Sequence, residues 1–326
     1  MATKLISTTE ELKSGMGAIN VDLSYEAITS FIDDAELNHI IPAIGYPLYN
    51  ALLAAITTNT LTEKQTRALA LIRKAEANFT IHYFVAFGAV GITESGIYVT
   101  KDATHLPASD KKLYLLRMQS RADGFRALEA AVNYLEANLA DFPAYATDVT
   151  HQLNRRFYIN TTDEFSRGFN LGQNAEVFST LKAVMETVEE NYIDPLLGDD
   201  LSAVLRAAIL TGSLSADQQK LVTKITKAVA LLSIAEAIPY RLVNIEANGL
   251  VTSTTKGNIE NIEVSTEGDQ RRLQGMMNML QMRGESEMGK LTKWLNDHAS
   301  DFSGYVVTDL LAKSKMNDDE RGVYFV

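Results

Sequence analysis

Two residues of types that bind metals, Glu36 and His39, stand three positions apart. A glutamate and a histidine three positions apart share one face of a helix, which is the spacing used in carboxylate-bridged di-iron bundles. Such a centre needs two of these pairs and further carboxylates. The second half of the chain has Glu189 and Tyr192 at the corresponding positions, so a phenol replaces the second histidine. We therefore interpret His39 as a boundary histidine hydrogen-bonded near a helix end, and we predict no metal and no cofactor.

A phosphate site is the next candidate, because the segment 284–291 nearly matches a Walker A loop. It has Leu291 where that loop carries the serine or threonine that binds magnesium. It also lies inside a predicted helix, whereas a Walker A loop follows a buried strand. We interpret Gly284 and Gly289 as two small residues on a packed helix.

Motifs for covalent and hydrolytic chemistry are absent from the sequence. It contains no Gly-x-Ser-x-Gly elbow, no His-Glu-x-x-His zinc motif and no Gly-x-Gly-x-x-Gly loop. The lack of cysteine excludes thiolate nucleophiles and thiolate metal ligands. A carboxylate pair stays open as an alternative because the chain has 41 acidic residues. The acidic doublets are expected on solvated faces, and we predict that the protein is not an enzyme; the doublets are Asp33-Asp34, Asp199-Asp200 and Asp318-Asp319.

A basic doublet occurs in both halves, as Lys111-Lys112 and as Arg271-Arg272. Each stands near the start of a predicted long helix, where positive charge opposes the helix dipole by a few tenths of a kcal/mol. Two interpretations remain open. The doublets either form local ion pairs, for instance with Asp110 or Asp269, or contact an acidic neighbouring chain or a phosphate.

These motifs belong to a sequence whose second half repeats the first. A shift of 153 residues places residues 5–98 on residues 158–251 without a gap, and 26 of the 94 pairs are identical. Beyond Tyr98 the register becomes 160, because one loop is 7 residues longer in the second half. Internal repetition of this length indicates a duplicated domain.

Each copy has the pattern of a helical unit. Threonine and glutamate at capping-box spacing start a short helix, an amphipathic helix follows, and a proline and a glycine then break the chain. A capped longer helix, a short extended segment and a long closing helix complete the unit. We predict a mainly α fold, a tandem duplication of a helical connector-like domain with short β or extended segments near 97–99 and 250–252. The expected parts are a first unit over residues 1–150, a second over 151–310 and a tail over 311–326, with a polar linker near 146–157.

Composition narrows the class of protein further. The 326 residues carry a net charge of −11, which argues against a general nucleic-acid binder because such a protein needs a basic surface. No long apolar run predicts a transmembrane helix, and no signal peptide is expected at the N-terminus. A reducing compartment fits the absence of cysteine.

The repeat unit resembles the small all-helical head–tail connector (adaptor) proteins of tailed bacteriophages. The resemblance spans residues 5–305 and is carried by Leu-Ile-Ser-Thr-Thr-Glu-Glu-Leu at residues 5–12, by Pro42-x-x-Gly45-x-x-Leu48-Tyr49-x-x-Leu52, and by the Asp-Phe-x-x-Tyr words that end each unit. The chain is most similar to a double-length family of phages and prophages of gut anaerobes. Typical connectors have one helical domain, so the second domain is a departure.

This resemblance implies a virion structural protein, assembled in the bacterial host cytoplasm. The expected form is a homo-oligomeric ring that joins the portal protein to neck or tail proteins, with double-stranded DNA only as cargo passing through the channel and with no membrane. An acidic wall suits such a channel. The segments 92–109 and 245–269 are the expected contact regions, and the apolar end of the tail, residues 322–326, is expected to dock on a neighbour or on the strand near Leu250.

Two other classes of protein remain as alternatives. One is a host-encoded helical scaffold or binding module. The other is an enzyme with an unrecognised carboxylate site.

Overall fold

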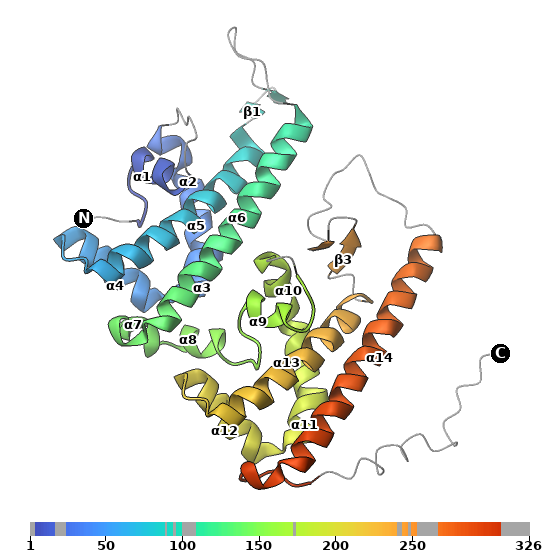
Figure 1. Cartoon of the computed structure of the whole chain (residues 1–326). Coiled ribbons are helices and arrows are strands. Elements are labelled where there is room, and N and C mark those ends of the chain that lie inside the picture. Colours follow the sequence, from blue (N-terminus) through green and yellow to red (C-terminus); the bar gives the residue numbers. More distant parts are fainter. Residues whose placement is uncertain are drawn as a thin grey trace. The chain divides into compact units, whose positions relative to one another are not determined.

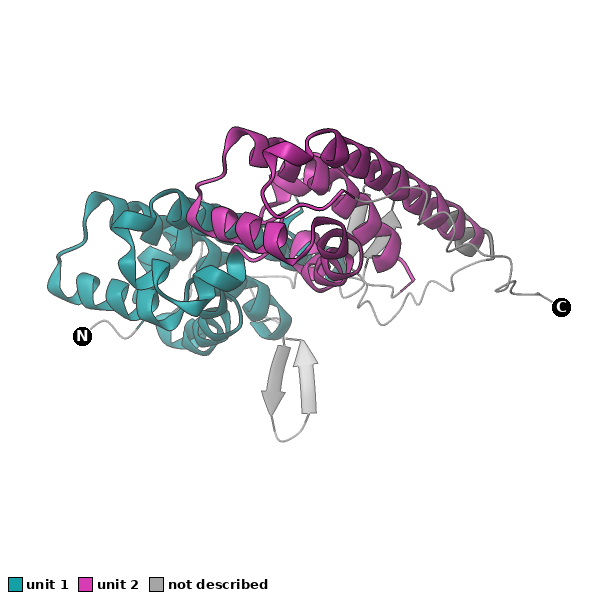
Figure 2. Ribbon diagram, turned by 90° about the horizontal axis from the view of Figure 1, so that it is seen from below, with its two compact units in different colours: residues 1–154, 174–176 teal, residues 155–173, 177–326 magenta. Residues whose placement is uncertain are grey.

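The computed structural model describes residues 4–16, 24–88, 90–93, 96–99, 109–171, 174–239, 243–246, 249–252 and 267–307. The chain forms two compact units (Figures 1 and 2). Unit 1 contains residues 1–154 and 174–176, and unit 2 contains residues 155–173 and 177–326. The fold is mainly α-helical and built as a two-part repeat, as the sequence predicts.

Unit 1 is a sequence of helices closed by a long helical hairpin. Its elements are α1 (Thr9–Met16), α2 (Tyr25–Ala35), the π-helical segment η1 (Glu36–Ile40), α3 (Ile41–Ile44), α4 (Tyr46–Thr58), α5 (Glu63–Gly88), β1 (Val90–Thr93), β2 (Gly96–Val99), α6 (Asp110–Ala137), the 3-10 segment η2 (Leu139–Asp141), α7 (Pro143–Ala146) and α8 (Val149–Asn154).

Unit 2 repeats the order of these elements up to its last 3-10 turn. It contains α9 (Thr162–Ser166), α10 (Ala175–Val188), η3 (Glu189–Ile193), α11 (Asp194–Leu197), α12 (Asp199–Thr211), α13 (Ala216–Ala237), β3 (Val243–Glu246), β4 (Gly249–Thr252), α14 (Glu267–Asp297) and η5 (Ala299–Asp301). The π segments, α3 and α11, and α4 and α12 match residue for residue at the shift of 153. The closing helices α6 and α14 end 160 residues apart.

The core of each unit lies along its long hairpin. Helix α5 packs along α6 in unit 1, and α13 packs along α14 in unit 2. Both hairpins use a glycine at the crossing. A Cβ on Gly124 would lie 2.8 Å from the Phe79 ring, and a Cβ on Gly284 would lie 2.6 Å from Leu232. The helices approach this closely because neither glycine has a side chain.

Each unit also carries a two-stranded antiparallel hairpin at the end of its long helix. Strand β1 pairs with β2, with Ile92 opposite Ile97. Strand β3 pairs with β4, with Ile245 opposite Leu250. The extended segments expected at 97–99 and 250–252 fall within β2 and β4.

The polar linker expected near residues 146–157 contains a short helix. Residues 149–154 form helix α8, which packs against α3 and α7. The sequence gives no apolar period there, because α8 is held by polar contacts: His151 is buried, and Asn154 donates a hydrogen bond to the Ala43 carbonyl oxygen at 2.8 Å.

No single described helix is long and apolar enough to cross a membrane. Residues 25–44 and 46–58 reach such a length and composition only as a pair that is bent by 111°. The expected contact loops around residues 100–108 and 253–266, and the tail from residue 308 onward, lie outside the described residues.

Candidate functional site

Two buried glutamates, Glu36 and Glu189, are the first residues of the two π segments. Their exposed fractions are 5% and 1%. A π segment inserts an extra residue into a helical turn and is frequent at functional sites. Burial of a carboxylate is costly unless the group is hydrogen-bonded or paired with a charge. The contacts of the two glutamates therefore decide what each can do.

Both glutamates make the same contact with the backbone. The Leu5 amide donates a hydrogen bond to Glu36 Oε1 at 3.1 Å, and the Tyr158 amide donates one to Glu189 Oε1 at 2.9 Å. Leu5 and Tyr158 are equivalent at the shift of 153, and both are buried. Each glutamate thus satisfies a buried N–H group and fixes the segment that enters its unit.

In unit 2 a cation accompanies the buried glutamate. Arg206 Nη2 lies 3.2 Å from Glu189 Oε2 and 3.0 Å from Asp194 Oδ2. The guanidinium also lies over the Tyr158 ring, 4.7 Å from its centre. The Ser202 hydroxyl donates a hydrogen bond to Asp194 Oδ1 at 2.7 Å. These side chains form one network, in which the Arg206 cation lies between the carboxylates of Glu189 and Asp194.

The electrostatics of this network follow from its burial. Burial raises the pKa of Glu189 to about 8, while Arg206 and the Tyr158 amide oppose the rise. Burial also raises the pKa of the Tyr158 hydroxyl. A raised pKa means that burial disfavours the charged carboxylate, so the adjacent Arg206 cation offsets part of the cost of burying Glu189.

Unit 1 has a second carboxyl group where unit 2 has no acid. Leu53 stands at the place of Arg206, and Glu76 stands at the place of Val229. Glu76 is fully buried, and neither of its carboxyl oxygens has a hydrogen-bond partner among the described residues. Burial, and next the charge of Glu36, raise the pKa of Glu76 well above its ordinary value. Burial likewise raises the pKa of Glu36.

His39 does not join Glu36. Its Nε2 atom lies 3.0 Å from the Tyr83 hydroxyl, and its ring stacks on Phe79 with 3.8 Å between ring centres. Burial lowers the pKa of His39 to about 4. In the part of the chain that the structure describes, no group of three or more histidine, aspartate and glutamate side chains is placed to hold a metal ion.

The Walker-like segment lies inside helix α14, and its two glycines differ. Gly284 touches Leu232, whereas a Cβ on Gly289 would meet no atom of a described residue within 4 Å. The interpretation as packing glycines therefore applies to Gly284 and is wrong for Gly289. The surrounding backbone is helical, so it does not form the loop that cradles a phosphate.

The basic doublets have different surroundings. Lys111 and Lys112 are exposed in the first turn of α6, and neither forms an ion pair with another described residue. Arg271 is exposed in α14, and the side chain of Arg272 lies outside the described residues.

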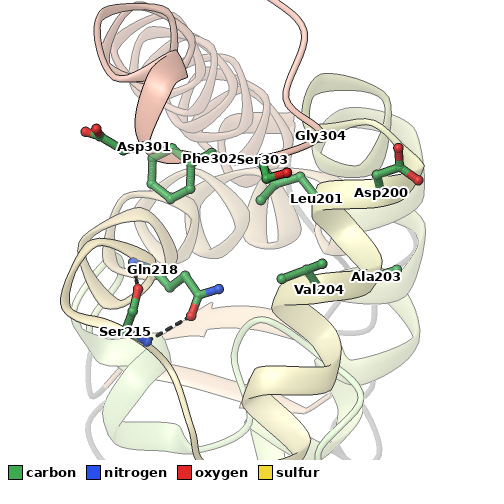
Figure 3. Close-up of a pocket in the computed structure, with 10 residues that line it drawn as sticks. All are labelled: Asp200, Leu201, Ala203, Val204, Ser215, Gln218, Asp301, Phe302, Ser303 and Gly304. Atoms are coloured by element: carbon green, nitrogen blue, oxygen red, sulfur yellow. Dashed lines mark hydrogen bonds between the residues drawn. The ribbon is translucent and has the colours of Figure 1, made fainter.

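A surface cavity of about 600 Å³ opens in unit 2 (Figure 3). Its floor is apolar, with Leu201, Val204 and Phe302, and its rim carries Asp200 and Asp301. The Ser215 and Gln218 side chains face it but are occupied in the capping box of α13. None of the buried glutamates lines this cavity.

The equivalent surface of unit 1 is bridged by an ion pair. There Lys64 forms an ion pair with Asp141, which joins the start of α5 to η2. The equivalent residues in unit 2 are Asp217 and Asp301, two acids that cannot pair with each other. Asp217 instead pairs with Lys220 in its own helix, at 2.9 Å.

The sequence pattern singles out Glu36 only as the helix neighbour of His39, and it does not single out Glu76 or Arg206. A usable signal was present, because Glu36 and Glu189 are identical in the two copies whereas His39 and Tyr192 are not. A residue that recurs with the fold indicates a structural need. The geometry agrees, since each glutamate is spent on a buried backbone amide.

Comparison with known proteins identifies a family without an assigned activity. A model described as a family of unknown function, DUF6712, matches residues 40–152 and residues 193–314. No curated protein and no solved structure matches the chain. The two matches begin 153 residues apart, which is the register of the repeat. Because they cover more than half of the 326 residues, the chain belongs to the DUF6712 family and carries its domain twice.

Proposed function

We propose that the protein is a structural subunit of a tailed-phage virion, a head–tail connector whose ring joins the portal to the neck or tail around the DNA channel. The observation that carries the proposal is the use of polar groups in the two copies. Glu36 and Glu189 are buried and bound to backbone amides, so neither is available to a substrate. In both copies of the domain, the buried carboxyl group binds the protein's own backbone. This use of the carboxyl groups fits a role in assembly rather than in catalysis.

Exposed apolar side chains on the closing helices support this role. Tyr114, Leu115 and Leu116 are 38%, 54% and 42% exposed on α6, and Met279 and Met282 are 42% and 70% exposed on α14. Grouped apolar side chains on a surface mark sites of protein contact. The two methionines line a shallow hollow of about 480 Å³. We assign these two helix faces to contacts with neighbouring subunits or with the portal.

The charge of the chain suits the channel. A net charge of −11 repels phosphate groups, so DNA would pass without adhering. In this proposal the protein needs no cofactor and does not contact a membrane.

A helical binding module is the second candidate, and the cavity of unit 2 favours it. Its volume of about 600 Å³ falls in the range of small-molecule sites. Its acidic rim would select a cationic or basic group.

Co-expression with the portal protein encoded in the same genome tests the proposal. We expect the purified chain to bind the portal and to form rings, seen by light scattering as a defined large species. A chain that stays monomeric and never binds the portal would contradict the proposal and favour the binding module.

A further inference from the structure

In unit 1, a segment after the last 3-10 turn covers the break between α3 and α4. Gly45 forms this break with a φ of +79°, and it is buried. A side chain at Gly45 would collide with the Asp148 carboxylate and would lie 3.0 Å from Thr150 Oγ1. Residues 148–154 therefore lie directly on the break.

Specific hydrogen bonds hold this segment in place. Asn154 donates to the Ala43 carbonyl oxygen at 2.8 Å and to the Tyr145 hydroxyl at 3.1 Å. His151 Nδ1 lies 3.0 Å from Glu136 Oε1, which also accepts a hydrogen bond from the Tyr145 hydroxyl at 2.6 Å. The cover is thus a built contact of α8 with α3, α6 and α7.

The same break in unit 2 is bare among the described residues. Gly198 has the matching φ of +75°, but it is exposed, and no atom of a described residue would lie within 4 Å of its Cβ. The neighbouring contact is kept, because the Tyr305 hydroxyl donates to Asn296 Oδ1 at 2.8 Å, as Tyr145 does to Glu136. The Tyr305–Asn296 contact, which is equivalent to Tyr145–Glu136, is thus present, but no described residue covers Gly198.

The repeat indicates which residues belong on this surface. The register of 160 places Thr308–Ser314, which lie outside the described residues, on Asp148–Asn154. Leu311 then replaces His151, and Asn296 replaces Glu136. Unit 2 thus lacks both the acid and the histidine of this pair. Their joint replacement is expected if residues 296 and 311 lie next to each other, as Glu136 and His151 do in unit 1. The family model also continues to residue 314 in its second match and to residue 152 in its first.

We propose that the surface around Gly198 is a docking site for the chain's own residues 308–314. The segment covers the break between α11 and α12 as residues 148–154 cover the break in unit 1. This docking would also fix the point from which the remaining tail, residues 315–326, leaves unit 2. The inference does not rest on the proposed connector function.

Disulfide trapping tests the proposal, because the natural chain has no cysteine. Gly198→Cys is combined with Thr308→Cys, the equivalents of Gly45 and Asp148. The matched control joins Thr308→Cys to Gly212→Cys, another exposed glycine of unit 2 with positive φ. Gly45→Cys with Asp148→Cys serves as the positive control.

We expect the test pair to oxidise to an intramolecular disulfide about tenfold faster than the control pair, because docking raises the local concentration of the two thiols. An equal rate in the two pairs would overturn the docking. Disulfide-linked dimers at low protein concentration would assign the surface to another copy's segment and overturn the own-chain assignment.

Hydrogen exchange gives a second readout if Gly198→Cys disturbs folding. The natural chain is compared with one that ends at Val307. We expect amides of residues 198–204 to lose protection in the shortened chain while those of residues 45–51 keep it. Unchanged protection in both stretches would contradict the proposal.

Discussion

Glu36 and Glu189 occupy the same position in two copies of one domain, yet their neighbours differ in charge. Around Glu189 the chain places Arg206, and around Glu36 it places a second acid, Glu76. The backbone hydrogen bond is common to both. The comparison shows that the fold requires the buried glutamate and its amide partner, while the means of lowering the cost of burial has diverged. Arg206 offsets the charge of Glu189 in unit 2, whereas in unit 1 burial raises the pKa of both Glu36 and Glu76.

The largest effect is expected from giving unit 2 the residue of unit 1. Arg206→Leu removes the cation between Glu189 and Asp194 and leaves the buried Glu189 carboxyl group and the half-buried Asp194 without this partner charge. We expect unit 2 to lose about 3–5 kcal/mol of its free energy of unfolding. Denaturant unfolding followed by the fluorescence of Trp294, the chain's single tryptophan, reports on unit 2.

Glu189→Gln, combined with Arg206→Leu in a double variant, is the control. It keeps an oxygen that accepts the hydrogen bond of the Tyr158 amide and removes the charge, so the double variant should recover much of the lost free energy of unfolding. If Arg206→Leu lowers the free energy of unfolding by less than about 1 kcal/mol, the Arg206–Glu189 pair contributes no more than a surface ion pair. That result would contradict the difference proposed between the two units.

An intermediate effect of opposite sign is expected from giving unit 1 the residue of unit 2. Glu76→Val replaces a buried carboxyl group that has no hydrogen-bond partner among the described residues. We expect unit 1 to gain about 1–3 kcal/mol, the cost of an unsatisfied buried polar group. Helical circular dichroism should show the gain, while the transition seen by Trp294 stays unchanged.

The stability of unit 1 should also depend on pH through Glu76. The pKa of Glu76 is raised in the folded state, so its contribution is fully present below its ordinary pKa of 4.5 and is lost as pH rises through the raised value. Unit 1 should therefore weaken toward alkaline pH, and Glu76→Val should weaken less. Equal pH profiles for the natural chain and the variant would contradict the assignment.

The smallest effect is expected at the surface. Lys64→Asp gives unit 1 the acid that stands at position 217 and breaks the ion pair with Asp141. Because the pair is exposed, its loss should lower the stability of unit 1 only slightly, and the effect should shrink in high salt. Lys64→Ala, measured in parallel, separates the lost attraction from the added repulsion. A large loss of stability that persists in high salt would contradict this expectation for an exposed pair.

The sequence predicts the fold far better than the polar centres. The repeat register, the capping residues and the breaks at Pro42 and Pro195 suffice to order the helices, because these signals are local. The contact of Glu36 with Glu76 is not local, since 40 residues separate them and only the packing of α5 brings them together. Helix α8 was missed for the related reason that its stability comes from distant polar partners.

Electron cryo-microscopy of the portal protein co-expressed with the chain tests the proposal that this duplicated domain is an assembly subunit. We expect a ring of this protein beneath the portal, with DNA-sized space at its axis and the exposed apolar residues of α6 and α14 at subunit contacts. A portal without bound protein, beside a chain that remains monomeric at the same concentration, would contradict it.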